Sequence, residues 1–157
     1  PRVFPLWADT LGSQFVAHPP IQPYRVAPSP DVADAPIELR ELVADVEPFE
    51  TDDELYLSEY HDRDRIVPLL ETHWQGDATG FVEHDWHAAD PRHLVMYLRP
   101  LGAGAVLYNT LGHCRGHFDM APVMAYYPRI ERCSWELPVF HELLRRSIRW
   151  ARTGLGD

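Results

Sequence analysis

The stretch Leu94–His117, LVMYLRPLGAGAVLYNTLGHCRGH, contains two short apolar runs separated by turn residues. The runs, Leu94–Leu98 and Ala105–Tyr108, are rich in Val, Leu and Tyr, which is typical of buried strands. The intervening Pro-Leu-Gly-Ala-Gly at 100–104 favours a turn, so the sequence predicts a hairpin. The second run leads into His113, which we expect at the rim of the sheet, where an imidazole becomes available for chemistry.

The length and composition are those of one globular domain, and we expect residues 1–157 to form it. The net charge of −10 argues against nucleic acid and anionic membrane surfaces as the main partners. No apolar run is long enough to span a membrane and no signal-peptide pattern opens the chain, so we expect a soluble protein. Two cysteines, Cys114 and Cys133, make no disulfide framework, which favours reduced thiols in the cytoplasm.

Other regions also have the periodicity of regular structure. Apolar residues four apart predict a short helix between Trp7 and Phe15. Short apolar runs at Tyr24–Ala27 and Ile66–Glu71 predict two further strands. Ser134 is a favourable N-cap for a C-terminal helix. The predicted buried face of that helix consists of residues at helical spacing: Val139, Leu143, Leu144, Ser147, Ile148 and Ala151.

Five motifs in this order resemble the trehalose-utilisation (ThuA-like) family. They are Phe-Val-Ala-His-Pro-Pro at 15–20, Asp-Glu-Leu-Tyr at 53–56, Ile-Val-Pro-Leu-Leu-Glu-Thr at 66–72, Gly-Ala-Gly-Ala-Val-Leu-Tyr-Asn-Thr-Leu-Gly-His at 102–113, and the C-terminal helix from Pro138 to Ala151. Their order and spacing match the family from about Trp7 to Ala151. The resemblance implies a class I glutamine amidotransferase-like fold, that is, a flavodoxin-like, doubly wound α/β sheet. It also implies a role in the metabolism of trehalose, a related disaccharide or a keto-sugar.

The chain departs from the family pattern in two ways. The family's glycine-rich run carries two basic residues, and Ala103 and Ala105 stand in their places here. The family's N-terminal half has no counterpart, and the chain begins at Pro1 rather than Met. We therefore expect a sheet and cleft that are incomplete at the N-terminus. An unpaired apolar edge is a template for another chain, so we also expect a homo-oligomer.

The candidate catalytic residue is His113, which can act as an acid or a base near neutral pH. The resemblance implies a similar histidine after a late strand, and a cleft-facing residue at His18. Glu54 and Tyr56 alternate along an expected strand and so share one face, with Asp53 on the other. A carboxylate beside an aromatic ring suits a sugar, which binds through hydroxyl groups and ring stacking. We therefore predict substrate binding by residues of these motifs: His18, Asp53, Glu54, Tyr56 and His117.

No nucleophile is evident, because no Ser or Cys lies in a strand–turn–helix elbow. His18, an acidic residue at 53 or 54, and His113 could bind a divalent metal, but no tight ligand pair is visible and we predict no cofactor. The cluster His84, Trp86 and His87 is predicted to be a solvated loop. Two functions stay open: an enzyme acting on a small-molecule sugar, and a non-catalytic carbohydrate-binding or interaction module that keeps the fold.

Overall fold

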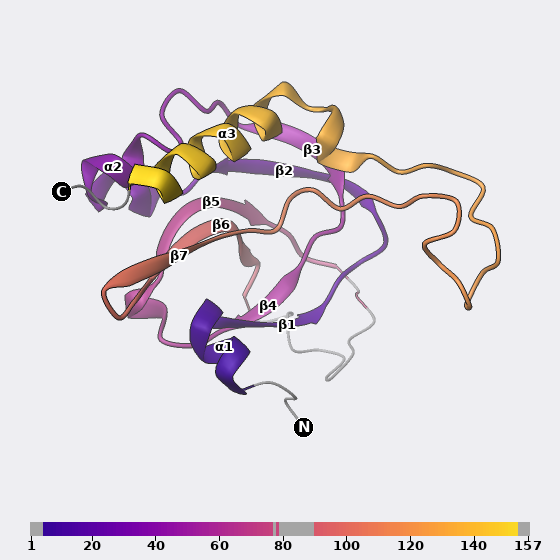
Figure 1. The fold of residues 1–157 in the computed structure, drawn as a ribbon, viewed down its shortest axis with the longest axis horizontal. Coiled ribbons are helices and arrows are strands. Elements are labelled where there is room, and N and C mark those ends of the chain that lie inside the picture. The colour runs from indigo at the N-terminus through magenta and orange to yellow at the C-terminus, as the bar shows by residue number, and fades with distance from the viewer. Residues whose placement is uncertain (1–4, 77, 79–89, 154–157) are drawn as a thin grey trace.

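The computed structural model describes residues 5–76, 78 and 90–153 (Figure 1). It contains a five-stranded sheet in the order β3-β2-β5-β6-β7 and a two-stranded ribbon of β1 and β4. The elements follow the chain as α1 Pro5–Leu11, β1 Ser13–Ala17, β2 Gln22–Pro28, η1 Pro30–Asp34, α2 Ile37–Arg40, β3 Phe49–Asp53, β4 Leu57–Tyr60, η2 Arg63–Arg65, β5 Val67–His73, β6 Arg92–Leu101, β7 Gly104–Asn109, η4 Cys133–Glu136 and α3 Pro138–Thr153, where η denotes a 3-10 helix. The cluster His84, Trp86 and His87 lies outside the described residues.

The predicted hairpin is present as β6 and β7. The two strands pair antiparallel from Met96 with Asn109 to Leu101 with Gly104. Gly102 in the turn has a φ of 59°, a conformation that glycine adopts without steric cost. Strand β6 is almost wholly buried, whereas β7 is half-buried and lies at the edge of the sheet.

The predicted flavodoxin-like, doubly wound α/β fold is wrong. Every pairing between the described strands is antiparallel. A doubly wound sheet needs parallel strands joined by crossover helices on both faces. Of the three α-helices described, only α3, with 16 residues, is long enough to cover a sheet; α1 has seven residues and α2 has four. A short apolar run marks a buried strand but does not specify the direction of its neighbour.

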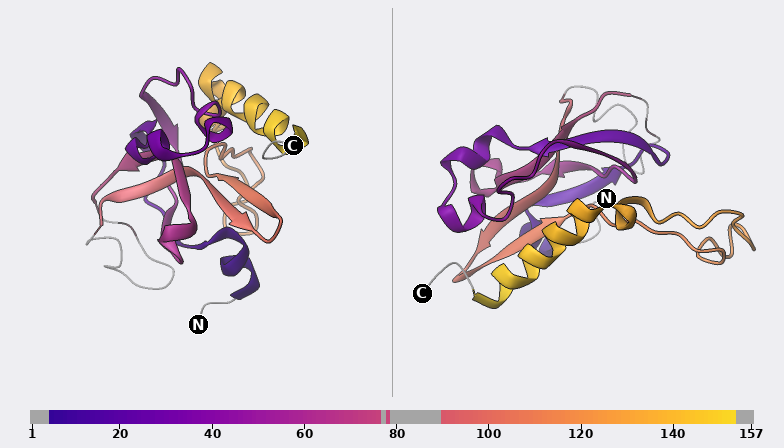
Figure 2. Two further views of the ribbon diagram at one scale, coloured as in Figure 1. Left: turned by 90° about the vertical axis from the view of Figure 1, so that its left-hand side faces the viewer. Right: turned by 90° about the horizontal axis from the view of Figure 1, so that it is seen from above.

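Helices α2 and α3 lie on a different side of the molecule from α1 and the small ribbon. In Figure 1, α2 and α3 lie along the top, whereas α1, β1 and β4 lie at the bottom. Arg146 on α3 joins that helix to the segment that follows α2, because its Nη1 donates to the carbonyl oxygen of Ala44 at 2.6 Å. Figure 2 shows that the sheet curls, and that the segment between β7 and η4 extends away from the body.

The C-terminal helix was predicted correctly, and so was much of its buried face, since Leu143 is buried and Val139 and Leu144 pack against the core; its start and the C-terminal end of that face were not. It begins at Pro138, because Ser134 belongs to η4 and its hydroxyl is bonded to Asp53. Phe140 and Leu143 are its buried residues, whereas Ile148, expected in the core, is 57% exposed. Helical spacing therefore predicted the face, and tertiary contacts determine how far along the helix it is buried.

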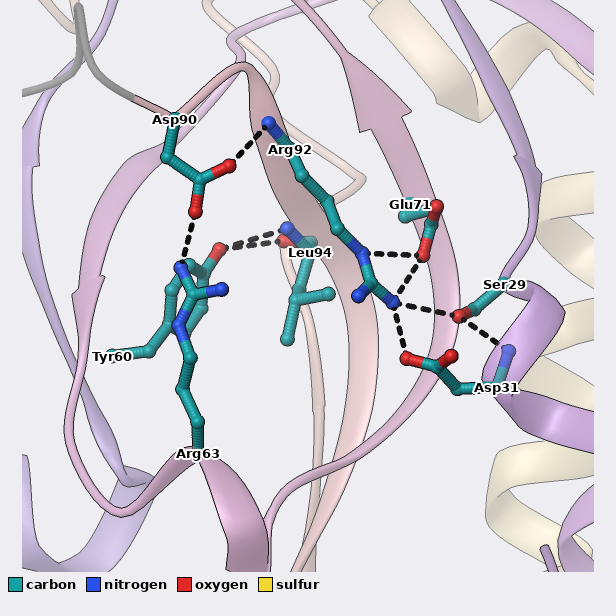
Figure 3. Close-up of polar contacts among 8 residues, drawn as sticks. All are labelled: Ser29, Asp31, Tyr60, Arg63, Glu71, Asp90, Arg92 and Leu94. Carbon is teal, nitrogen blue, oxygen red and sulfur yellow. Dashed lines mark hydrogen bonds and ion pairs between the residues drawn. The ribbon is translucent and has the colours of Figure 1, made fainter. Parts of the chain in front are cut away.

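A cluster of charged side chains joins β5, β6 and the start of η1 (Figure 3). Glu71 on β5 is buried, and Arg92 on β6 donates to its Oε2 through Nε at 2.9 Å and through Nη2 at 2.7 Å. The same Nη2 donates to Ser29 Oγ at 3.1 Å and to Asp31 Oδ2 at 2.6 Å. A buried carboxylate needs such a partner, so Arg92 fixes η1 against the sheet.

Candidate functional site

Three segments that lie far apart in the sequence meet at the carboxylate of Glu54. Glu54 lies in the connection from β3 to β4 and is only 7% exposed. His18 follows β1, and its Nδ1 lies 3.4 Å from Glu54 Oε1. His113 follows β7, and its Nδ1 lies 3.2 Å from Glu54 Oε2. Arg115, two residues later, places Nη2 3.7 Å from Glu54 Oε1. One nearly buried acid is thus surrounded by two imidazoles and a guanidinium.

The carboxylate of Asp53 accepts hydrogen bonds from the backbone segments that carry Glu54 and His113. It has no exposed surface, and its Oδ1 accepts from the amides of Glu54 at 2.7 Å and His113 at 3.3 Å. Its Oδ2 accepts from the amide of Gly112 at 3.1 Å and from the hydroxyl of Ser134. Asp53 therefore anchors the loop that carries His113; direct substrate binding by Asp53 stays a prediction.

Gly112 fixes the direction in which the chain leaves β7. Its φ is 105°, and a Cβ at this position would lie 2.9 Å from Phe140 Cζ. A side chain there would be strained by the backbone conformation and crowded by an aromatic ring. The Leu-Gly-His sequence thus places His113 beside Glu54 rather than in the core.

The contact with Glu54 selects one tautomer of His113. An ionised carboxylate only accepts hydrogen bonds, so the arrangement favours a proton on Nδ1 and a lone pair on Nε2. Within the described part of the chain, Nε2 is buried and has no hydrogen-bond partner. An unpaired buried nitrogen costs about 1–3 kcal/mol and is typical of functional sites rather than of well-satisfied cores.

Two aromatic rings lie near Glu54: Phe15 stacks beside His18, and Tyr56 packs against Phe15. Phe15 is 38% exposed, and its ring centroid is 6.0 Å from that of His18 and 4.9 Å from that of Tyr56. Burial raises the pKa of Tyr56, and the neighbouring Glu54 carboxylate raises it further. The Tyr56 hydroxyl therefore stays protonated and can donate a hydrogen bond near neutral pH.

The contacts of His117 are with Tyr127 and Tyr126 rather than with Glu54. Its Nδ1 lies 2.8 Å from the carbonyl oxygen of Tyr127, and its ring stacks on Tyr126 with centroids 4.7 Å apart. These contacts hold the base of the extended segment between β7 and η4. The structure therefore brings His18, Glu54, Tyr56 and His113 together, with Asp53 beneath them, but not His117.

The sequence analysis missed Arg115. Its Nη1 lies 3.3 Å from Glu131 Oε2, and its guanidinium lies over the ring of Tyr127 at 5.1 Å. A backbone bridge between Arg115 and Glu131 supports the same contact. Arg115 comes two residues after His113, and in an extended segment such residues project to the same side. That spacing was the signal that could have identified it.

The described residues contain no group of three or more His, Cys, Asp or Glu side chains arranged to hold a metal ion. His18 Nδ1 lies 2.9 Å from the carbonyl oxygen of Pro19, which is closer than the carboxylate of Glu54 at 3.4 Å. No helix in the described part of the chain is long and apolar enough to cross a membrane.

Comparisons of the chain with protein-family models, with curated proteins and with solved structures found no match. The resemblance to the ThuA-like family therefore stays a prediction based on the motifs, and the function is argued below from the site itself.

Proposed function

We propose that this chain binds a sugar, or the keto derivative of one, at Glu54 and that His113 acts there as a general acid and base. The observation that carries the proposal is the contact between His113 Nδ1 and Glu54 Oε2, 3.2 Å apart, together with the unpaired Nε2 on the opposite side of the ring. A carboxylate that holds an imidazole in one tautomer leaves the other nitrogen free to take a proton.

The chemistry that suits this pair is proton transfer at a carbon beside a carbonyl group. The carbonyl of a keto-sugar acidifies the adjacent C–H bond. His113 Nε2 would accept that proton, the electron pair would move onto the carbonyl oxygen, and the imidazolium would return the proton in the reverse step. Arg115 and His18 are the neighbouring donors that could stabilise the oxygen as it gains charge.

The surrounding groups suit a carbohydrate. The C–H face of a sugar ring packs on aromatic side chains, and Phe15 and Tyr56 form an aromatic pair beside His18. Sugar hydroxyl groups need both donors and acceptors, which Tyr56, His18 and Glu54 provide. The motif resemblance to the ThuA-like family supports the same class of ligand. The two cysteines, which form no disulfide, support a cytoplasmic setting.

One observation favours a second function, a carbohydrate-binding module without catalysis. His113 Nε2 is buried, and the His113 side chain is only 17% exposed. A substrate would reach this nitrogen only after the covering groups move. If they do not move, the site can bind a sugar at Phe15 and Tyr56 but cannot transfer a proton.

A comparison of binding with turnover tests the proposal. Trehalose, its 3-keto derivative and divalent cations would be screened by thermal shift, and sugar turnover would be followed by NMR. We expect the keto-sugar to stabilise the protein and to be turned over. We expect His113→Gln to abolish turnover while binding is retained.

His73→Gln is the matched control, because His73 is an exposed histidine at the end of β5. It should leave both binding and turnover unchanged. Binding without turnover by the unmodified protein would select the binding module. Equal turnover by His113→Gln would remove His113 from the mechanism, and the absence of any sugar effect would overturn both functions.

A further inference from the structure

The outgoing and returning parts of the segment between β7 and η4 meet beside Glu54. The amide of Arg115 donates to the carbonyl oxygen of Glu131 at 2.9 Å, and the amide of Glu131 donates to the carbonyl oxygen of Arg115 at 2.9 Å. Farther along the segment, the amide of Tyr127 donates to the carbonyl oxygen of His117 at 2.7 Å. These contacts bring the side chains of Tyr127 and Glu131 against that of Arg115.

The guanidinium group of Arg115 lies between two carboxylates. Its Nη2 is 3.7 Å from Glu54 Oε1, and its Nη1 is 3.3 Å from Glu131 Oε2. It also lies over the ring of Tyr127 at 5.1 Å. The Tyr127 hydroxyl donates to Glu131 Oε1 at 2.8 Å, so one tyrosine contacts the guanidinium group and orients the carboxylate beside it. Arg115 is therefore positioned by Tyr127 and Glu131 as well as by Glu54.

This arrangement leaves Glu54 shared between Arg115 and His113. Arginine and a carboxylate prefer to pair through two parallel hydrogen bonds, one to each oxygen. Arg115 instead approaches Oε1, and Oε2 lies 3.2 Å from His113 Nδ1. Loss of the Glu131 carboxylate would release Nη1 of Arg115 and favour a bidentate pair with Glu54, at the expense of the contact with His113.

We infer that Glu131, oriented by Tyr127, is a positioning residue for His113. It acts through Arg115, because it holds one end of the guanidinium group away from Glu54. Glu54 Oε2 then stays available to the imidazole, which keeps the proton on Nδ1 and the lone pair on Nε2. The inference rests on the proposed function, in which His113 Nε2 takes the proton, and it adds the base of the extended segment to the site.

The tautomer of His113 tests this positioning without any sugar. Nitrogen-15 NMR spectra of the full chain, recorded at alkaline pH where imidazoles are neutral, show which ring nitrogen carries the proton. The spectrum of His113→Gln identifies the signals of His113. We expect the Nδ1–H tautomer in the unmodified protein. Glu131→Gln should convert most of it to Nε2–H, the tautomer that free histidine prefers.

Tyr127→Phe should give an intermediate mixture of tautomers, because it removes the hydrogen bond to Glu131 but leaves the carboxylate in place. Glu131→Gln/Tyr127→Phe should give the same tautomers as Glu131→Gln alone, since Tyr127 acts through Glu131. Two matched controls should leave the tautomer unchanged. Glu136→Gln neutralises an exposed carboxylate, and Tyr126→Phe removes the hydroxyl of a tyrosine that is 55% exposed.

Turnover of the keto-sugar gives a second measurement. Glu131→Gln should lower kcat by at least about tenfold, which is part of the factor of about 10²–10⁴ that a positioned base supplies. KM should change by less than about twofold, because the aromatic pair that we propose to bind the sugar is not altered. A loss of folding stability alone would change neither kcat per folded molecule nor the tautomer of His113.

An unchanged tautomer of His113 in Glu131→Gln would overturn the inference, whether or not the protein turns over a sugar. Additive effects of Glu131→Gln and Tyr127→Phe would also overturn it, as would an equal change in Glu136→Gln. The expected change of tautomer in a protein that turns over no sugar would support the positioning of His113 and would count against the proposed function instead.

Discussion

Asp53 and Glu54 are adjacent carboxylates with different surroundings. Asp53 is enclosed by backbone amides and the hydroxyl of Ser134, whereas Glu54 faces two imidazoles and a guanidinium. Their side chains leave the backbone in opposite directions, as adjacent residues of an extended segment do. The first therefore organises the loop, and the second organises the side chains that we propose to be functional.

The anchoring role of Asp53 can be measured as folding stability. Asp53→Ala would leave the amides of Glu54, Gly112 and His113 without their acceptor, so we expect a loss of about 3–5 kcal/mol in the free energy of unfolding. Ser134→Ala removes only one donor and should cost about 1 kcal/mol. Urea denaturation measures both changes. Equal losses in the two variants would mean that Asp53 does not anchor the loop.

At the scale of elements, the hairpin was predictable because its pattern is local. Short apolar runs on either side of a Gly-rich turn specify β6 and β7, and a glycine with positive φ closes the turn. The position of the hairpin in the sheet was not predictable, since it depends on contacts with distant strands. β7 lies at the edge, and the cross-strand neighbours Leu98 and Leu107 differ in burial.

That difference in burial gives an expected difference in stability. Leu98 is 1% exposed and faces Leu107 directly across the hairpin, whereas Leu107 is only partly buried. Leu98→Ala should lower the free energy of unfolding by about 2–5 kcal/mol. Leu107→Ala should cost about 1–2 kcal/mol, because part of its surface already meets water. Chemical denaturation would contradict the topology if Leu107→Ala proved the more costly change.

At the scale of the whole molecule, the sequence indicated the site better than the fold. The structure brings together His18, Glu54 and His113, which the sequence analysis had assigned to one site from the motifs that carry them. The sheet topology was taken from a family resemblance, and neither burial nor periodicity distinguishes parallel from antiparallel neighbours. Arg115 was missed although its position two residues after His113 could have identified it, and its contacts with Glu54 and Glu131 depend on the conformation of the loop. A homo-oligomer stays a prediction.

Buried tyrosines should make the whole protein sensitive to alkali. Burial raises the pKa of five of them above the usual 10.0, to about 12 for Tyr97; the others are Tyr24, Tyr56, Tyr60 and Tyr108. The unfolded chain releases these protons near pH 10 while the folded chain retains them, so stability present below pH 10 is lost as the pH rises further. Tyr97 alone should account for roughly 2–3 kcal/mol between pH 10 and 12.

Urea midpoints measured from pH 8 to about 12 would show this loss. Tyr97→Phe should flatten the decline, although it also removes the hydrogen bond from the Tyr97 hydroxyl to the carbonyl oxygen of Leu11 at 3.0 Å. A stability profile that stays level through this range, or the same slope in Tyr97→Phe, would contradict the burial of these phenols.

We propose that His113, beside Glu54, transfers a proton to and from a sugar. The most direct test of this proposal is hydrogen–deuterium exchange at the carbon next to the carbonyl of 3-keto-trehalose, followed by proton NMR in deuterium oxide. The unmodified protein should accelerate the loss of that proton signal, and His113→Gln, still binding the sugar, should reduce exchange to the uncatalysed rate. Bound sugar that exchanges no faster with the unmodified protein than in buffer would refute general acid–base chemistry at His113.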